Sequence, residues 1–149
     1  MLRRFMTHWV PLLLWMSVIF GASTGLGTPA HTSRFVRPFL LWLDPHMSEE
    51  TIELVHHCIR KTAHAVEYAI LGFLVWRVVH STPALASHSS AHHFRLALLL
   101  AALYAATDET HQLFVPGREA AVRDVLLDTC GAGFGLTLTW LAVRGRKSA

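Results

Sequence analysis

Acidic, basic and imidazole side chains gather in three short stretches of an otherwise apolar chain. The stretches hold Lys61, His64, Glu67 and Tyr68, then Asp108, Glu109, His111 and Gln112, and finally Asp124 and Asp128. Each stretch contains pairs that are three or four residues apart, such as Lys61 and His64, Asp108 and His111, and Asp124 and Asp128. This spacing places side chains on one face of a helix. Carboxylates and imidazoles can act as general acids and bases, and cationic side chains bind phosphate or carboxylate groups. The three stretches are therefore a candidate site.

Three interpretations of these residues are open. Asp108 and His111 have the spacing of the carboxylate–histidine pairs in di-iron bundles, and His64 could complete a metal site. No cysteine-based or His-Glu-x-x-His pattern indicates zinc, and the sequence identifies no cofactor. The second interpretation is a buried network of ion pairs and hydrogen bonds that holds three helices together.

In the third interpretation, the cluster binds or transforms a charged head group, with Lys61 and Arg118 receiving its anionic part. A buried carboxylate or an imidazole would then be the general acid or base. The candidate catalytic residues are His64, Glu67, Asp108, Glu109 and His111. The candidate binding residues are Lys61, Tyr68, Gln112, Arg118, Asp124 and Asp128.

The composition indicates that lipid surrounds most of the chain. Hydrophobic residues make up 52% of the 149 residues and charged residues only 15%, whereas soluble domains carry about 25% charged residues. The length fits one domain over residues 1–149. Two cysteines do not make a disulfide framework, and no run of lysine and arginine suggests nucleic acid as a partner. We predict an all-α integral membrane bundle of about four transmembrane helices.

Four apolar segments can supply these helices. The predicted spans are residues 9–27, 63–80, 95–115 and 124–143, each close to the roughly 20 residues that cross a hydrocarbon core. The first could instead be a cleaved signal peptide, but a retained span is favoured because the rest of the chain is also membranous. Residues 28–47 are apolar but interrupted by charges and prolines, which predicts an interfacial helical segment before the second span.

The order of the stretches along the chain predicts that they meet. The first stretch opens the second span, the next closes the third span, and the last opens the fourth span. Because consecutive spans alternate in direction, all three stretches lie at the same face of the membrane. A carboxylate in a membrane helix costs about 2.5–3.5 kcal/mol, so these side chains should face the interior of the bundle. The distribution of lysine and arginine predicts cytoplasmic termini and places the stretches at the outer face.

Three further local patterns carry predictions. Ser48 resembles the N-cap of a long helix that continues into the second span. Gly131 and Gly135 form a small-xxx-small pattern, for which close packing inside the bundle is favoured over dimerisation. The polar segment 81–93 is predicted to be a loop, and the histidines at its ends and within it are expected to be solvated. These histidines are His80, His88, His92 and His93.

Two ordered motifs of this chain carry a family resemblance. The first runs Lys61-Thr-Ala-His64-Ala-Val-Glu67-Tyr68-Ala-Ile-Leu-Gly72-Phe73. The second joins Asp108-Glu109-Thr-His111-Gln112-Leu-Phe114-Val-Pro116-Gly117-Arg118 to Asp124-Val-Leu-Leu-Asp128-Thr-Cys-Gly131-Ala132. From Arg60 to Gly135, apart from the loop after the second span, the chain resembles the VanZ-like membrane proteins. Asp128 departs from the pattern, because many relatives carry Asn there, and this would change the charge at the centre of the site.

The resemblance implies a membrane protein of several helices, related to a factor linked to resistance against the glycopeptide teicoplanin. Together with the polar stretches, it predicts a protein of the cytoplasmic membrane that handles an envelope lipid or its anionic head group, or modulates glycopeptide susceptibility. A non-catalytic scaffold, whose polar residues are structural, is one alternative, and a small transporter is another. The expected partners are the bilayer and an anionic envelope lipid, and the sequence leaves catalysis open.

Overall fold

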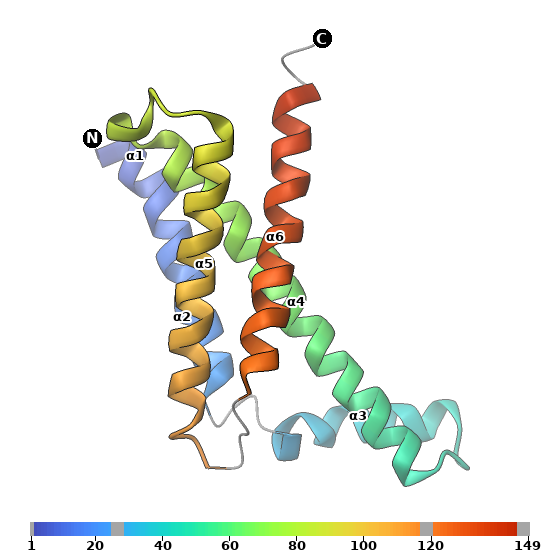
Figure 1. The fold of residues 1–149 in the computed structure, drawn as a ribbon. Coiled ribbons are helices and arrows are strands. Elements are labelled where there is room, and N and C mark those ends of the chain that lie inside the picture. Colours follow the sequence, from blue (N-terminus) through green and yellow to red (C-terminus); the bar gives the residue numbers. More distant parts are fainter. Residues whose placement is uncertain (1, 25–28, 117–120, 146–149) are drawn as a thin grey trace.

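The computed structural model describes residues 2–24, 29–116 and 121–145, and the elements in these ranges are all helices. In chain order they are α1 (Leu2–Arg4), the π-helical turn η1 (Phe5–Trp9), α2 (Val10–Ser23), α3 (Pro29–Leu43), α4 (Glu49–Ser81), the short 3-10 helix η3 (Pro83–Leu85), α5 (Ser90–Gln112) and α6 (Val122–Gly145). The first three elements follow one another without a break and form a single rod (Figure 1). The predicted all-α class is confirmed.

Three helices of the described residues are long and apolar enough to cross a bilayer. They are Leu2–Ser23, Glu49–Ser81 and Val122–Gly145. Helix α5, which contains most of the predicted third span, has 23 residues but is not among them. Histidines and an arginine at one end of α5 and two acidic residues at the other lower its mean hydropathy. Three of the four predicted spans thus have the length and composition of membrane helices, as expected of a membrane protein.

The helix boundaries differ from the predicted spans by several residues. The first rod begins at Leu2 and ends at Ser23, while the end of that predicted span, residues 25–27, lies outside the described residues. Helix α5 ends at Gln112, because a hydrogen-bonded turn follows in which the Phe114 amide donates to the His111 carbonyl at 3.0 Å. Hydropathy locates an apolar run, whereas local hydrogen bonding decides where its helix ends.

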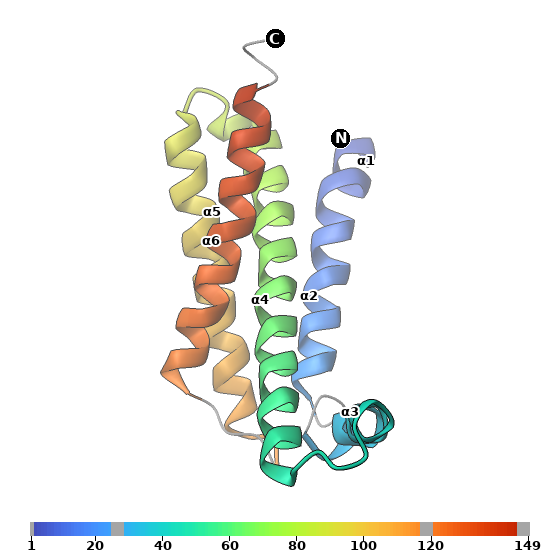
Figure 2. The same cartoon turned by 90° about the vertical axis from the view of Figure 1, so that its right-hand side faces the viewer.

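Helix α4 is the longest element and connects the membrane to a peripheral layer. Its 33 residues extend over about 50 Å at about 1.5 Å per residue, which exceeds a hydrocarbon core of about 30 Å. The predicted N-cap is confirmed, since the Ser48 hydroxyl accepts a hydrogen bond from the Thr51 amide at 3.3 Å. Helix α3 lies across the direction of the other helices beside the start of α4 (Figures 1 and 2). A helical segment before the second span is therefore confirmed.

The predicted loop of residues 81–93 is shorter than expected, and one of its histidines is buried. Helix α5 already begins at Ser90, because the Ser89 hydroxyl caps it by accepting from the His92 amide at 3.2 Å. The side chain of His93 is only 3% exposed, and its Nε2 is 2.9 Å from the Leu85 carbonyl oxygen. The expectation of a solvated histidine is wrong for His93, whereas His88 and His92 are exposed.

Small residues bring α4 and α6 into close contact. A Cβ atom added to Gly131 would lie 2.5 Å from the Ala65 carbonyl oxygen, and one added to Gly72 would lie 2.5 Å from the Ala132 carbonyl oxygen. Gly135 similarly abuts the backbone of Ala69. No side chain fits between backbones at these distances, so the glycines serve packing within the bundle, as predicted. The contact fixes the positions of the polar residues on α4 and α6.

Candidate functional site

The three polar stretches lie at one end of the helical bundle. The end of α5 and the start of α6 meet there, beside the end of α2 and the middle of α4, whereas the start of α1 and the end of α6 lie at the opposite end (Figures 1 and 2). We call this group the polar cluster. Its described members are Ser23, Lys61, His64, Glu67, Tyr68, Asp108, Glu109, His111, Gln112, Asp124 and Asp128. Arg118, also predicted for the site, lies outside the described residues.

Asp108 is held by two donors from different parts of the chain. Its carboxylate is buried, with the residue 3% exposed, and accepts hydrogen bonds from the Ser23 hydroxyl at 2.6 Å and from Gln112 Nε2 at 3.3 Å. Ser23 was not among the predicted site residues. It closes the first span, so the same alternation of span directions that grouped the other polar stretches places it at this end. The Asp108–Ser23 bond joins α5 to α2.

Two further carboxylates hold the start of α6. The Ala121 amide donates to Glu109 Oε2 at 3.1 Å, and Lys61 Nζ donates to Asp124 Oδ1 at 2.5 Å. The Lys61–Asp124 ion pair is partly buried, with side chains 29% and 16% exposed. Hydrogen bonds to charged groups are stronger than those between neutral groups. Glu109 and Asp124 therefore have partners that connect α6 to α5 and α4.

Asp128 and Tyr68 differ from these residues, because their polar atoms are buried without hydrogen-bond partners. Both residues are 0% exposed. Among the described residues, the two oxygens of the Asp128 carboxylate have no hydrogen-bond partner, and the Tyr68 hydroxyl has none either. The imidazole of His64 lies beside Asp128, with Nδ1 3.7 Å from Oδ1. The centre of the cluster thus holds a buried carboxylate and a buried hydroxyl that lack a hydrogen bond among the described residues.

Aromatic side chains border the polar cluster on the α2 side. Trp15 Nε1 donates to the backbone carbonyl of Glu67 at 2.9 Å, and the Tyr104 hydroxyl donates to the Met16 carbonyl at 2.7 Å. The ring of His111 packs on Phe20 with centroids 4.6 Å apart, and its buried Nε2 has no hydrogen bond within the described ranges. These contacts attach α2 to the bundle at the level of the cluster.

The described residues do not arrange as a metal site. The structure groups no three His, Cys, Asp or Glu side chains from residues 2–24, 29–116 and 121–145 in a way that could hold a metal ion. Asp108 is instead engaged by Ser23 and Gln112, and His64 lies nearest Asp128. The geometry supports hydrogen bonding and charge pairing at this end of the bundle.

The fold and the cluster define an all-helical membrane protein with ionisable side chains buried at one end of its bundle. The family model described as VanZ/LLP1 matches residues 8–143. The chain therefore belongs to the VanZ/LLP1 family, as its two motifs predicted. No curated protein and no solved structure matches it.

Proposed function

We propose that the protein acts at the outer face of the cytoplasmic membrane, where the polar cluster binds the anionic head group of an envelope lipid. The observation that carries this proposal is the pair of fully buried residues Asp128 and Tyr68, whose polar atoms have no hydrogen-bond partner among the described residues. Kinship with a teicoplanin-resistance factor suggests the consequence, a changed response of the envelope to glycopeptides of this type.

Unpaired buried polar groups have a cost that a purely structural cluster would avoid. Most buried polar atoms in proteins are hydrogen-bonded, and leaving one unsatisfied costs about 1–3 kcal/mol. Ionisable residues inside membrane helices commonly mark functional sites. A head group with hydroxyl groups would donate to Asp128, and its phosphate would accept from the Tyr68 hydroxyl. Binding would then satisfy the groups that the fold leaves unsatisfied.

The positive charge for the phosphate comes from residues around this centre. Lys61 is only partly buried at the edge of the cluster, and His64 lies beside Asp128. The proposal includes Arg118 as a further cation, since it follows Pro116-Gly117 and precedes α6 in the sequence. Arginine can bind phosphate with two parallel hydrogen bonds. Binding alone is proposed, and acid–base chemistry by His64 or Glu67 is not required for it.

The hydrogen bonds of Asp108, Glu109 and Asp124 favour a structural role for that part of the cluster. These carboxylates have partners, and their bonds connect α2, α4, α5 and α6. The scaffold alternative thus applies to them, whereas it leaves Asp128 unexplained. The transporter alternative has less support, because fully buried residues between the two ends of the bundle, such as Leu71, Ala101 and Leu136, are apolar.

The experiment compares two isosteric substitutions, Asp128→Asn and Asp108→Asn. Native mass spectrometry of the purified chain with phosphatidylglycerol measures lipid binding, immunoblotting measures abundance, and teicoplanin susceptibility is measured in cells that express each variant. We expect Asp128→Asn to have normal abundance and about tenfold weaker lipid binding, as for loss of one strong contact. Asp108→Asn should lower abundance and function together. Unchanged lipid binding and susceptibility in Asp128→Asn would refute the proposal.

A further inference from the structure

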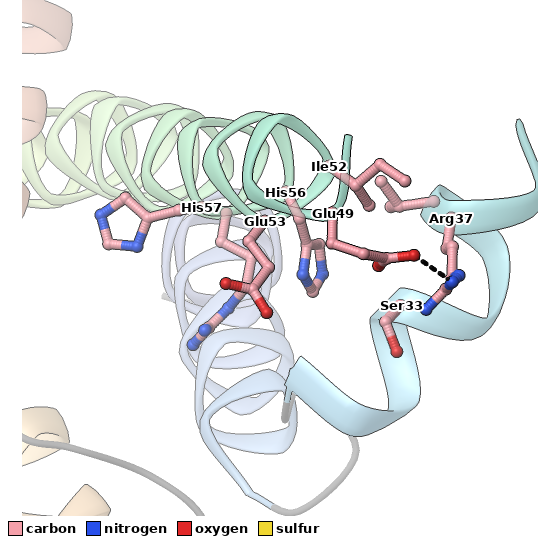
Figure 3. A pocket seen from close by; sticks show the side chains of 9 residues that line it. Ser33, Arg37, Glu49, Ile52, Glu53, His56 and His57 are labelled. Atoms are coloured by element: carbon pink, nitrogen blue, oxygen red, sulfur yellow. Dashed lines mark hydrogen bonds and ion pairs between the residues drawn. The ribbon is translucent and has the colours of Figure 1, made fainter. Parts of the chain in front are cut away.

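A polar pocket lies outside the polar cluster, between α3 and the first turns of α4 (Figure 3). Its volume is about 460 Å³, within the range of roughly 300–1,000 Å³ that small-molecule sites occupy. Charged and polar side chains of both helices line it, among them Ser33, Arg37, Glu49, Glu53, His57 and Arg60. We call it the α3–α4 pocket.

Two contacts between the helices fix the walls of this pocket. Arg37 Nη2 donates to Glu49 Oε1 at 2.5 Å, and Figure 3 shows this ion pair reaching from α3 to α4. The Thr32 hydroxyl and His56 Nε2 are 2.7 Å apart and share a hydrogen bond. Partial burial, with the neighbouring Arg60 and His57, lowers the pKa of the His56 imidazole, which belongs to the part of α4 before the predicted span 63–80. The lowered pKa favours the neutral form of His56, and Arg37 is paired with Glu49.

Two opposite charges in the pocket remain available after these contacts are assigned. Arg60 is half-buried, Glu53 is exposed, and neither has an ion pair within the described part of the chain. An arginine is suited to a phosphate, which it can bind with two hydrogen bonds, and a carboxylate is suited to an ammonium group. The lining therefore complements a ligand that carries both a phosphate and a primary amine.

The position of the pocket corresponds to the level of lipid head groups. Helix α4 is longer than a hydrocarbon core is thick, and the pocket lies at its N-terminal part, beside the crosswise α3 (Figures 1 and 2). Helix α3 exposes Phe35, Phe39 and Trp42, which are 80%, 57% and 76% exposed, together with arginines. Helices of this composition lie in the interface between acyl chains and water. A phospholipid in the bilayer can thus reach the pocket with its head group.

We propose that the α3–α4 pocket binds the phosphoethanolamine head group of a phospholipid, with the phosphate on Arg60 and the ammonium on Glu53. The proposal is independent of the function assigned to the polar cluster. It uses none of the residues of that cluster, and it concerns a zwitterionic head group rather than an anionic one.

Lipid binding to the purified full-length chain tests this proposal. Native mass spectrometry would compare phosphatidylethanolamine with phosphatidylcholine, whose quaternary ammonium cannot donate to Glu53, and with soluble O-phosphoethanolamine. We expect phosphatidylethanolamine to bind most tightly. Arg60→Gln should weaken the binding of both phospholipids by about tenfold, as expected for loss of one charge-assisted contact. Glu53→Gln should abolish the preference for ethanolamine over choline. Arg34→Gln is the matched control, because Arg34 is an exposed arginine of α3 that does not line the pocket.

Three results would overturn the proposal. In the first, Arg60→Gln and Arg34→Gln weaken binding equally, which indicates general attraction by positive charge. In the second, Glu53→Gln keeps the preference for ethanolamine. In the third, only soluble O-phosphoethanolamine binds. Circular dichroism verifies that each variant is folded. If Arg60→Gln does not fold, the proposal is tested by whether Glu53→Gln loses the preference for ethanolamine over choline. Asp128→Asn should bind phosphatidylethanolamine normally, which separates this site from the polar cluster.

Discussion

Substitution of Asp108 by Asn tests whether the hydrogen-bonded half of the polar cluster stabilises the bundle. In the native chain the carboxylate accepts from Ser23 on one oxygen and from Gln112 on the other. In Asp108→Asn one oxygen becomes an NH₂ group, so that one native donor faces another donor. We expect the variant to be less stable than the native chain, with its helices intact.

The magnitude follows from the two hydrogen bonds. A hydrogen bond to a charged group contributes about 1.5–3 kcal/mol, and Asp108→Asn loses one such bond and weakens the other. Rotation of the Gln112 amide can present its oxygen to the new NH₂ group, and removal of a buried charge offsets part of the loss. We therefore expect a net destabilisation of about 1–3 kcal/mol, which lowers Tm by about 2–12 °C at 2–4 °C per kcal/mol.

Circular dichroism of the purified variants in detergent measures this change. A thiol-reactive dye is unsuitable, because Cys58 and Cys130 are both exposed in the folded chain. Asp44→Asn is the matched control, since Asp44 is an exposed aspartate whose side chain accepts a local bond from the His46 amide. Ser23→Ala and the double variant complete a thermodynamic cycle, in which a coupling of about 0.5–3 kcal/mol is expected for residues in contact. An unchanged Tm for Asp108→Asn, or additive effects in the cycle, would refute the reasoning.

Two other predictions concern helix packing and orientation. Gly131→Ala places a Cβ against the Ala65 backbone and should cost about 1–3 kcal/mol by overpacking, whereas Gly21→Ala, with nothing within 4 Å of the added atom, should leave Tm unchanged or higher. Equal melting temperatures would contradict the close α4–α6 contact. A membrane-impermeant maleimide should label Cys58 in intact cells of a Cys130→Ser variant, because the start of α4 is expected at the outer face. Labelling only after permeabilisation would reverse the proposed orientation.

The sequence predicted the main elements because hydropathy and capping are local properties. The long apolar runs, the N-cap at Ser48 and the helical segment before the second span depend on residues close together in the chain. The buried His93 was not predicted, because a polar sequence with Ser and His also fits the capped start of a helix. Its burial depends on contacts with Leu85 and with the aromatic residues near the end of α4.

The candidate site was partly predictable for a topological reason. Alternation of span directions groups polar residues that open or close successive spans, whatever the details of packing. That argument does not specify partners, and the bond between Ser23 and Asp108 joins residues 85 positions apart. The α3–α4 pocket was not predicted either, because its walls depend on how α3 folds back against α4.

The division of the polar cluster gives each half a physical role. Asp108, Glu109 and Asp124 exchange hydrogen bonds with groups on other elements, so they hold α2, α4, α5 and α6 in fixed relation. Burying Asp128 and Tyr68 without such partners is unfavourable, and a bundle with mobile helices would relax to satisfy them. The hydrogen bonds of Asp108, Glu109 and Asp124 prevent that relaxation. The close backbone contacts of Gly131 and Gly135 with α4 also prevent it. The frame therefore keeps the polar atoms of Asp128 and Tyr68 unsatisfied. Because both residues are 0% exposed, the proposed head group reaches them only through a local opening of the helices, and its hydrogen bonds must offset the free energy of that opening.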